Sequence, residues 1–252
     1  MVRRTIGPGR HTRGAELAVA GYARLDRDRA RRVGVPEIVL GEGKTPEHLL
    51  GILEALRAQG HGALVSRPTG PQRQALARAA RRGLPVSFLA GGRLVRLAGP
   101  LGVRYRPGLV AVVTAGTSDV PLAEEAIAVL HEFGIRTVSA HDVGVAGLHR
   151  LLRAIPRLER GAPELYLVFA GREGALPTVI AGLVHAPVVG VPTSVGYGRG
   201  GRGEAALSAM LQSCAPIAVV NIDAAVPASL FAAQRFALRP APTRRRPRRS
   251  AA

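Results

Sequence analysis

The segment Gly108–Pro121 (GLVAVVTAGTSDVP) constrains the fold of this chain more than any other. Its residues of little polarity, Leu109–Ala115, predict a strand that is buried on both faces. A short polar loop follows at Gly116–Asp119, and the spacing of apolar residues over Val120–Phe133 predicts a helix. A strand, a tight loop of small residues and a helix together present backbone N–H groups to an anion. This segment therefore predicts an α/β fold with a binding site at the end of a strand.

The same order of elements recurs along the rest of the chain. Strands are predicted at Ile135–Ser139, Leu165–Ala170, Val188–Val191 and Ile217–Val220, and helices at Val145–Ile155, Leu176–Val184 and Glu204–Leu211. Such spacing needs crossover connections, which join parallel strands and cover both faces of the sheet. We expect an open, mostly parallel, doubly wound sheet of the Rossmann or flavodoxin type.

A smaller α/β domain is predicted ahead of this sheet. Its expected elements are a charged helix within Ala15–Arg32, strands at Glu37–Leu40, Ala63–Ser66 and Pro85–Leu89, and helices that begin at Thr45 and span Gln72–Arg82. Thr45 has the character of an N-cap, with proline at the first helical position. The Gly-, Pro- and Arg-rich segment Gly91–Pro107 predicts the domain boundary. We assign residues 1–14 to a basic tail, 15–100 to the small domain, 101–238 to the catalytic domain and 239–252 to a disordered Arg-rich tail.

Composition narrows the classes of function. The 252 residues carry a formal net charge of +18, but Arg239–Ala252 holds six arginines and Met1–Gly14 four, with no acid in either, so most of the excess lies in the two tails. The C-terminal tail could contact RNA or an anionic membrane surface nonspecifically, yet the chain has no aromatic or groove-reading motif for specific nucleic-acid recognition. No apolar stretch is long enough to span a membrane, and no signal peptide is visible. A single cysteine excludes an internal disulfide and suits the cytoplasm, where we expect the protein to reside.

The loops that leave the carboxyl ends of parallel strands gather at one edge of the sheet, where ligands bind. Here they are Gly116–Asp119, His141–Gly144, Gly171–Gly174, Pro192–Gly198 and Asn221–Asp223. Five loops of small and hydroxylated residues favour a ligand that bears phosphate. Asp119, Asp142 and Glu173 are expected to lie near one another, where they could move protons, bind a divalent cation or contact ribose hydroxyls.

Each of these residues also has a structural interpretation. Ser118 and Asp119 are typical of a helix N-cap pair, and His149 fits a capping or core role as well as a catalytic one. Cys214 ends a predicted helix and precedes a buried strand, so alone it is typical of a small hydrophobic residue. A simple doubly wound topology puts Cys214 at the edge opposite the five loops, unless the helix ends early or a neighbouring subunit completes the site.

Several segments together resemble the pyridinium-3,5-biscarboxylic acid mononucleotide synthase family, which begins synthesis of the nickel-pincer nucleotide cofactor. They are GTSDVPLAEEA, HDVGVAGLHRLL, AGREGALPTVIAGLVHAPVVGVPTSVGYG and SAMLQSCA followed by VVNID, with upstream matches from Asp26 to Thr45. The resemblance covers about residues 15–223. The C-terminal half is also similar to the aminoimidazole ribonucleotide carboxylases, through SAH, GALPTVIAGL and PVVGVP.

The resemblance implies a specific reaction. Nicotinic acid adenine dinucleotide is carboxylated by CO2 at ring C5, and its phosphoanhydride is hydrolysed to release AMP. A pyridinium ring is too electron-poor for C5 to attack CO2. A thiolate that adds at C4 makes C5 an enamine carbon, which then attacks CO2 before the proton and the thiolate leave. The resemblance thus assigns Cys214 as the nucleophile, against its structural interpretation.

The resemblance also implies roles for other residues. Glu173 matches the family's active-site acid, and Asp142 and His149 are second choices for proton transfer. Residues expected to bind the substrate are Gly116, Thr117, Ser118, Asp119, Gly171, Gly174, Thr193, Ser194 and Gly196, together with Arg29, Arg32 and Lys44 of the small domain. These three basic residues also fit a solvated basic patch. No covalently bound cofactor is expected, and a magnesium ion on the substrate pyrophosphate is compatible with this chemistry.

The chain departs from the family pattern at Arg199–Glu204 and after Asp223, where AAVPAS replaces a glycine-rich continuation. The partners implied are the dinucleotide, CO2 or bicarbonate, and further copies of the chain in a tetramer or octamer, with no membrane and no specific nucleic acid. Two alternatives stay open: an aminoimidazole ribonucleotide carboxylase or mutase, which has no use for Cys214, and a basic RNA-binding protein.

Overall fold

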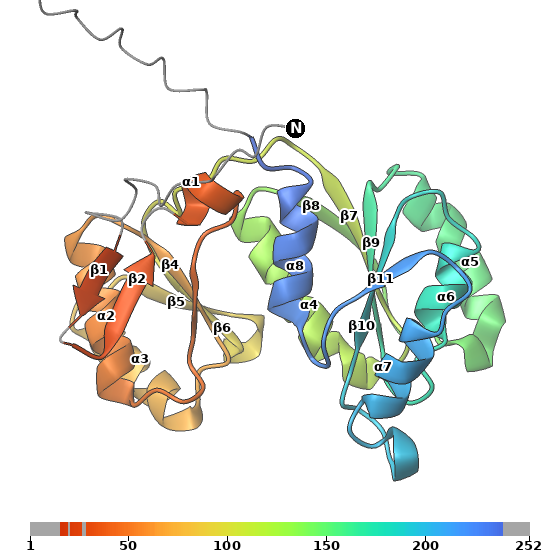
Figure 1. Cartoon of the computed structure of the whole chain (residues 1–252), viewed down its shortest axis with the longest axis horizontal. Helices are drawn as coiled ribbons and strands as arrows, with labels where there is room; N and C mark the ends of the chain where they lie inside the picture. The colour runs from red at the N-terminus through yellow and green to blue at the C-terminus, as the bar shows by residue number, and fades with distance from the viewer. Residues whose placement is uncertain (1–15, 20, 27–28, 239–252) are drawn as a thin grey trace, which may run out of the picture.

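The computed structural model describes residues 16–19, 21–26 and 29–238. The two tails predicted at residues 1–14 and 239–252 lie outside the described residues. Within them the chain forms an N-terminal unit and a C-terminal unit, which lie side by side in Figure 1.

The N-terminal unit is built on a four-stranded mixed sheet in the order β3-β4-β6-β5. Its strands are β3 (Ile38–Leu40), β4 (Ala63–Ser66), β5 (Val86–Leu89) and β6 (Leu94–Leu97). Helices α2 (Pro46–Ala58) and α3 (Gly70–Arg81) pack on one face, and a hairpin of β1 (Glu16–Val19) and β2 (Ala23–Asp26) lies beside α2. A short helix α1 (Arg29–Val33) follows the hairpin.

Local sequence chemistry sets where α2 and α3 begin. The Thr45 hydroxyl accepts a hydrogen bond from the His48 backbone N–H, as expected for an N-cap, and Pro46 occupies the first helical position. Thr69 and Gln72 form a reciprocal capping box on α3. Both caps satisfy N–H groups that a helix start otherwise leaves without partners.

The C-terminal unit is a five-stranded, wholly parallel sheet in the order β11-β10-β9-β7-β8. Its strands are β7 (Leu109–Thr114), β8 (Arg136–Ala140), β9 (Leu165–Ala170), β10 (Val188–Pro192) and β11 (Ile217–Val219). Counted from β7, this is the 2-1-3-4-5 order of flavodoxin-like sheets, whose strand order reverses between the first and third strands. The predicted doubly wound α/β fold is confirmed.

Helices cover both faces of this sheet. On one side lie α4 (Val120–Glu132) and α8 (Ala225–Gln234), and on the other α5 (Leu148–Glu159), α6 (Leu176–Ala181) and α7 (Glu204–Leu211), as Figure 1 shows. Short 3-10 turns η2 (Thr117–Asp119), η3 (Val145–Gly147) and η4 (Gly198–Gly200) precede α4, α5 and α7, and η1 (Ala90–Gly92) joins β5 to β6. Alternate residues of β7 and β9 face opposite layers, so both layers bury apolar side chains.

The layer of α4 and α8 also contacts the N-terminal unit. Leu64 and Leu94 of the small sheet are fully buried in the same apolar cluster as Val112 of β7 and Phe236 after α8. Burial of this kind contributes roughly 1.5–3 kcal/mol per large side chain. The two sheets therefore share one core through this helical layer.

One sequence prediction for the fold was wrong, and two elements were not predicted. The helix expected within Ala15–Arg32 is instead a hairpin, because Gly21 takes a left-handed turn (φ 78°) and Leu17 pairs with Leu25 across the strands. The boundary segment Gly91–Pro107 contains β6, which pairs with both β4 and β5. Helix α8 was not predicted at all.

Candidate active site

The loops after β7 and β9 flank the point where the strand order of the C-terminal sheet reverses. A cavity of about 330 Å³ opens there. Its lining comes from Ala115, Gly116, Ser118, Asp119, Gly144, Val145, Ala146, Arg150, Gly171, Arg172, Glu173 and Val195. Ligands of open α/β sheets bind at this switch point. The cavity therefore occupies the position that the strand order predicts for a site.

Asp119 holds two of these loops together. It is 3% exposed, and its carboxylate accepts hydrogen bonds from the Gly116 N–H (2.9 Å) and the Thr193 hydroxyl (2.6 Å). Burial raises the pKa of this carboxyl, helped by the charge of Asp223 and opposed by the two hydrogen bonds. Since both carboxylate oxygens have partners in the protein, Asp119 and Thr193 position the loops.

Asp142 is tied to the cavity wall by an ion pair. It accepts a hydrogen bond from Arg150, whose side chain lines the cavity, and its own N–H donates to the Thr114 hydroxyl (3.2 Å). Its φ of 56° is left-handed, a strained value for a residue that is not glycine. Arg150 was not among the predicted site residues, although it lies within the segment HDVGVAGLHRLL and in the first turn of α5.

Glu173 is the acid with the freest access to the cavity. Its side chain is 62% exposed and lies 4.0 Å from the Arg172 guanidinium. Among the described residues, no group of three His, Cys, Asp or Glu side chains is placed to hold a metal ion. The three carboxylates Asp119, Asp142 and Glu173 thus reach the same edge of the sheet, each in a different environment.

Glycine is required where the loops touch. A Cβ on Gly171 would lie 2.2 Å from the Val195 carbonyl oxygen, and one on Gly144 would lie 2.8 Å from that of Ala115. These contacts are shorter than real Cβ contacts, so the loops after β7, β8, β9 and β10 close on one another only with glycine there.

Other predicted residues lie at the margin of this cavity. Thr117, Ser194, Gly196 and His149 are exposed, and Gly174 is buried against Ala206 of α7. The Ser194 N–H donates to Asp223 (2.8 Å), which connects this edge to the loop before α8.

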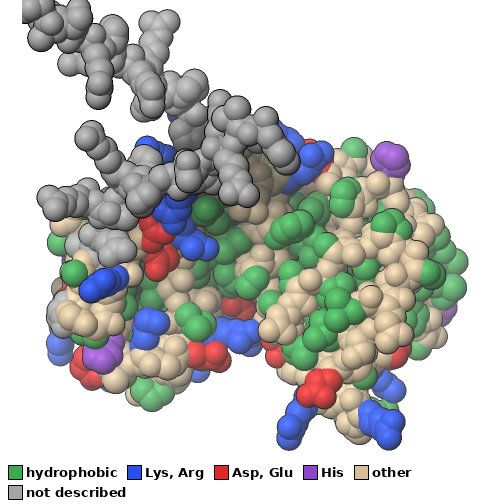
Figure 2. Space-filling view, in the orientation of Figure 1, with side chains coloured by type: hydrophobic (Ala, Val, Ile, Leu, Met, Phe, Trp, Pro, Cys, Tyr) green, Lys and Arg blue, Asp and Glu red, His purple; other side chains and the backbone are tan. Residues whose placement is uncertain are grey.

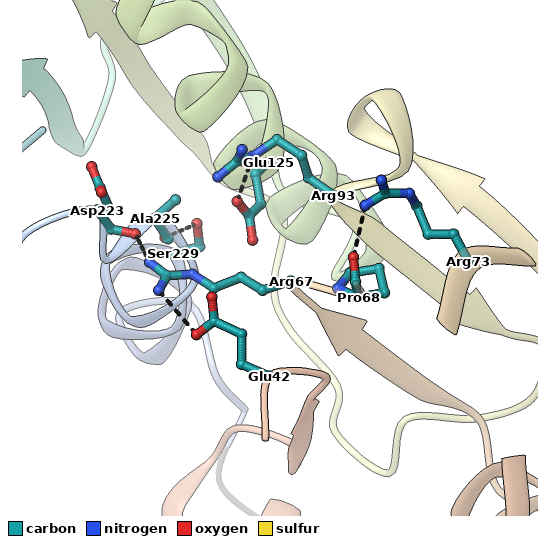
Figure 3. A network of polar contacts seen from close by, with 9 residues as sticks. All are labelled: Glu42, Arg67, Pro68, Arg73, Arg93, Glu125, Asp223, Ala225 and Ser229. Atoms are coloured by element: carbon teal, nitrogen blue, oxygen red, sulfur yellow. Dashed lines mark hydrogen bonds and ion pairs between the residues drawn. The ribbon is translucent and has the colours of Figure 1, made fainter. Parts of the chain in front are cut away.

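A second cavity, of about 500 Å³, lies between the two units. Its lining includes Arg29, Glu37, Arg67, Glu125 and Asp223. Figure 3 shows the polar contacts at this junction, and acidic and basic side chains lie side by side there in Figure 2.

In this network Arg67 donates to the Asp223 carbonyl oxygen and pairs with Glu42 at 3.7 Å. Arg93 pairs at 3.1 Å with Glu125 of α4, whose side chain is 1% exposed. Burial raises the pKa of Glu125, while the charges of Arg93 and Arg67 oppose that shift. The Arg93–Glu125 ion pair and the hydrogen bond from Arg67 to the Asp223 carbonyl oxygen connect the N-terminal unit to α4 and to the loop before α8.

Of the three basic residues predicted in the small domain, only Arg29 lines this cavity. Arg32 pairs with Asp26 on the exposed surface, and the Lys44 carbonyl accepts a hydrogen bond from Gln72. The structure therefore does not bring these three side chains together at one place.

Comparison with known proteins decides the family. The AIR carboxylase family model matches residues 109–250, and a LarB/PurE-like N-terminal domain model matches residues 17–91. An uncharacterized protein of Methanocaldococcus jannaschii is 37% identical over 212 residues, which are 83% of this chain and 82% of that protein. The chain belongs to the AIR carboxylase family.

Relatives that are named for an enzyme activity match about half of this AIR carboxylase family member. The N5-carboxyaminoimidazole ribonucleotide mutase of Mycobacterium tuberculosis is 34% identical over 137 residues, 53% of this chain and 74% of that protein. A crystal structure of a single-residue variant of Treponema denticola PurE2 matches 52% of this chain and 80% of that chain, at 27% identity and a TM-score of 0.44. By its family, the chain is thus related to carboxylase enzymes, and it carries an additional N-terminal domain.

Cys214 lies away from the cavity of the AIR carboxylase domain. It follows α7 and precedes β11, so it lies at the edge where strands enter the sheet, opposite the five loops, and it is exposed. Helix α7 ends at Leu211, which does not bring the thiol to the cavity. Within one copy of the chain, Cys214 and Glu173 are on opposite edges of the sheet.

No helix in the described part of the chain has the length and apolar character that crossing a bilayer requires.

Proposed function

We propose that this protein carboxylates the pyridinium ring of nicotinic acid adenine dinucleotide at C5 and hydrolyses its phosphoanhydride. The observation that carries the proposal is the LarB/PurE-like domain at residues 17–91 ahead of the AIR carboxylase domain. The ribonucleotide mutases match about half of the chain, so their activity does not account for this domain. The products would be pyridinium-3,5-biscarboxylic acid mononucleotide and AMP.

In the proposed reaction, a Cys214 thiolate adds to ring C4 and the C4–S bond forms. The displaced electron pair makes C5 an enamine carbon, which attacks CO2 and forms the new C–C bond. Glu173 then takes the C5 proton, the C4–S bond breaks, and aromaticity returns. Dividing the reaction through a covalent adduct replaces one difficult step with easier ones.

The cavity supports the other parts of this chemistry. Its loops offer backbone N–H groups and the Ser118 hydroxyl for phosphate or carboxylate oxygens, and Arg150 supplies a positive charge at the wall. Water attack on the anhydride breaks one P–O bond and releases AMP. A magnesium ion on the pyrophosphate would stabilise the charge on the leaving group.

The position of Cys214 adds a requirement to the proposal. Since Cys214 and Glu173 lie on opposite edges of one sheet, we propose that the thiol at each cavity comes from a neighbouring copy of the chain. The active protein is then a homo-oligomer, a tetramer or octamer.

The direct test is to incubate the protein with nicotinic acid adenine dinucleotide and bicarbonate and to analyse the products by mass spectrometry. We expect AMP and a ring product heavier by one carboxyl group. Wild type that makes neither product, or Cys214→Ala that makes both at an undiminished rate, would refute the mechanism. A parallel reaction with aminoimidazole ribonucleotide tests the carboxylase alternative, and deletion of residues 239–252 tests the RNA-binding alternative.

Complementation tests the shared site. Cys214→Ala and Glu173→Gln chains are each expected to be inactive alone, whereas co-expression forms mixed oligomers. Mixed oligomers that regain part of the wild-type rate would support a site built from two copies. Mixtures that stay inactive although mixed oligomers form would contradict it.

A further inference from the structure

Tyr197, in the loop after β10, is unusually exposed for an aromatic side chain. Its exposed fraction is 73%, larger than that of any other large hydrophobic side chain in the described part of the chain. The Arg172 guanidinium carbon lies 4.8 Å from the centre of its ring. One face of the ring thus contacts a cation, and most of the remaining ring surface is open to solvent.

The backbone holds this pair at the edge of the loop cavity. The Arg172 N–H donates to the Val195 carbonyl (3.3 Å); Arg172 and Val195 line the cavity, and Tyr197 follows two residues after Val195. Arg172 has a left-handed φ of 53°, and Gly196 has a φ of 156° at a position where a Cβ would lie 2.6 Å from the Gly200 carbonyl oxygen. The loop is therefore folded tightly on both sides of Tyr197.

The cavity is too small to hold a whole dinucleotide, so part of such a ligand would lie outside it. Its volume of about 330 Å³ is at the lower end of the roughly 300–1,000 Å³ typical of ligand pockets. A dinucleotide carries two bases, two riboses and two phosphates, so its second half must extend beyond such a cavity. The Tyr197–Arg172 pair is at the rim where it would emerge.

The cavity between the two units is the competing place for that second half. Two of its charged side chains, however, already form ion pairs within the protein: Arg67 with Glu42, and Glu125 with Arg93. The loop of Tyr197 instead carries two exposed arginines, Arg199 and Arg202, which line a shallow depression with Glu204 and Ser208. Figure 2 shows basic side chains at this lower tip of the C-terminal unit.

We propose that Tyr197, backed by Arg172, stacks against the purine base of an adenine nucleotide, which in the proposed function is the adenylate half of the substrate. The inference rests on the proposed function for the identity of the substrate. Base stacking on an aromatic side chain tolerates any base, so the ribose and phosphate contacts, with Arg199 and Arg202 close by, set the orientation. Removal of one stacking ring weakens nucleotide binding by about tenfold.

The test is equilibrium binding of AMP and of ribose 5-phosphate, measured by calorimetry on the full chain. Tyr197→Ala is expected to weaken AMP binding about tenfold and to leave ribose 5-phosphate binding unchanged, because only AMP carries the base. Tyr197→Phe should restore AMP binding, since it keeps the ring. Phe231→Ala, which removes another exposed ring at 52% exposure on α8, is the matched control and should bind AMP as wild type does.

Three results would overturn the proposal: wild-type AMP affinity in Tyr197→Ala, an equal loss for both ligands, or a change in oligomer mass by light scattering in that variant. Turnover of the dinucleotide separates this inference from the proposed function. If Tyr197→Ala loses AMP binding and wild type makes no carboxylated product, the proposed reaction fails while the base-stacking site remains. If wild type makes the product and Tyr197→Ala keeps its KM, the stacking site fails alone.

Discussion

The ion pair between Arg93 and Glu125 allows a stability effect to be worked out before it is measured. Arg93 Nε lies 3.1 Å from Glu125, whose side chain is 1% exposed, whereas the Arg93 side chain is 38% exposed. Arg93→Met keeps much of the apolar stem and removes the charge. The variant leaves a buried carboxylate without its nearest cation, which is the costly way to break a buried pair.

Protonation of Glu125 limits the loss. The ordinary pKa of this carboxyl is 4.5, and burial raises it in the native protein. Keeping the carboxyl group protonated costs about 1.36 kcal/mol for each unit by which the pH exceeds this ordinary pKa. At pH 7 the variant is therefore destabilised by at most about 3.4 kcal/mol. Since the Arg67 charge still favours the ionised form, we expect a loss of about 2–3 kcal/mol at pH 7.

The sign of the pH dependence follows from proton linkage. Loss of the Arg93 charge raises the pKa of Glu125 further above that of the unfolded chain, so the unfolded chain binds fewer protons than the native variant and the penalty grows as pH rises above 4.5 and shrinks as pH falls. At pH 5.5 the largest destabilisation that Arg93→Met can cause in this way is about 1.4 kcal/mol. The double variant Arg93→Met/Glu125→Gln should lose this pH dependence.

The assay is urea unfolding at pH 7 and pH 5.5, followed by circular dichroism. Arg82→Met, which makes the same change on an exposed side chain at the end of α3, is the control and should change the free energy of unfolding by less than about 0.5 kcal/mol. An Arg93→Met loss that is equal at both pH values would show that packing, and not the buried charge, causes it. That result would refute the reasoning.

Three further predictions concern loops, caps and core. Gly171→Ala forces a Cβ to 2.2 Å from the Val195 carbonyl oxygen. We expect a stability loss of about 1–3 kcal/mol by thermal unfolding and at least tenfold weaker binding of ribose 5-phosphate by calorimetry. Wild-type stability together with wild-type binding would contradict the loop packing. Thr69→Ala removes the capping box of α3 and should cost about 1 kcal/mol by urea unfolding, whereas Thr69→Ser should cost little; equal losses would count against the cap. Phe236→Ala leaves a cavity at a fully buried side chain and should lower the free energy of unfolding by about 3–5 kcal/mol in urea. A loss below about 1 kcal/mol would contradict the burial of Phe236 in the core beside α8.

The elements that the sequence predicted well are those whose signals are local. The strand at Leu165–Ala170 and the helix at Glu204–Leu211 were predicted to the residue, because a buried strand and a short helix bounded by glycine at its start carry their signal within one window. The Thr45 cap was likewise visible in four consecutive residues. These patterns also determined that five small-residue loops share one edge of a parallel sheet.

The elements that were missed depend on distant partners. Helix α8 has apolar residues on most of its surface and contains a proline, and it is stabilised between α4 and the sheet. Strand β6 lies in a segment rich in Gly and Arg and forms because β4 and β5 pair with it on both sides. Neither partnership leaves a periodic signal in its own segment.

The sequence by itself thus determined the α/β fold, the order of most elements and the edge of the sheet that carries the loops, since each follows from local periodicity and chain connectivity. Only the tertiary structure decided which partner each side chain at that edge contacts and which side chains stay exposed. Asp119 accepts a hydrogen bond from Thr193, and Asp142 accepts one from Arg150. Tyr197 stays exposed and contacts Arg172 with one face of its ring. Cys214 remained at the opposite edge. The physical reason is that hydrogen bonds and ion pairs between loops far apart in sequence are chosen by packing in three dimensions, which no single segment encodes.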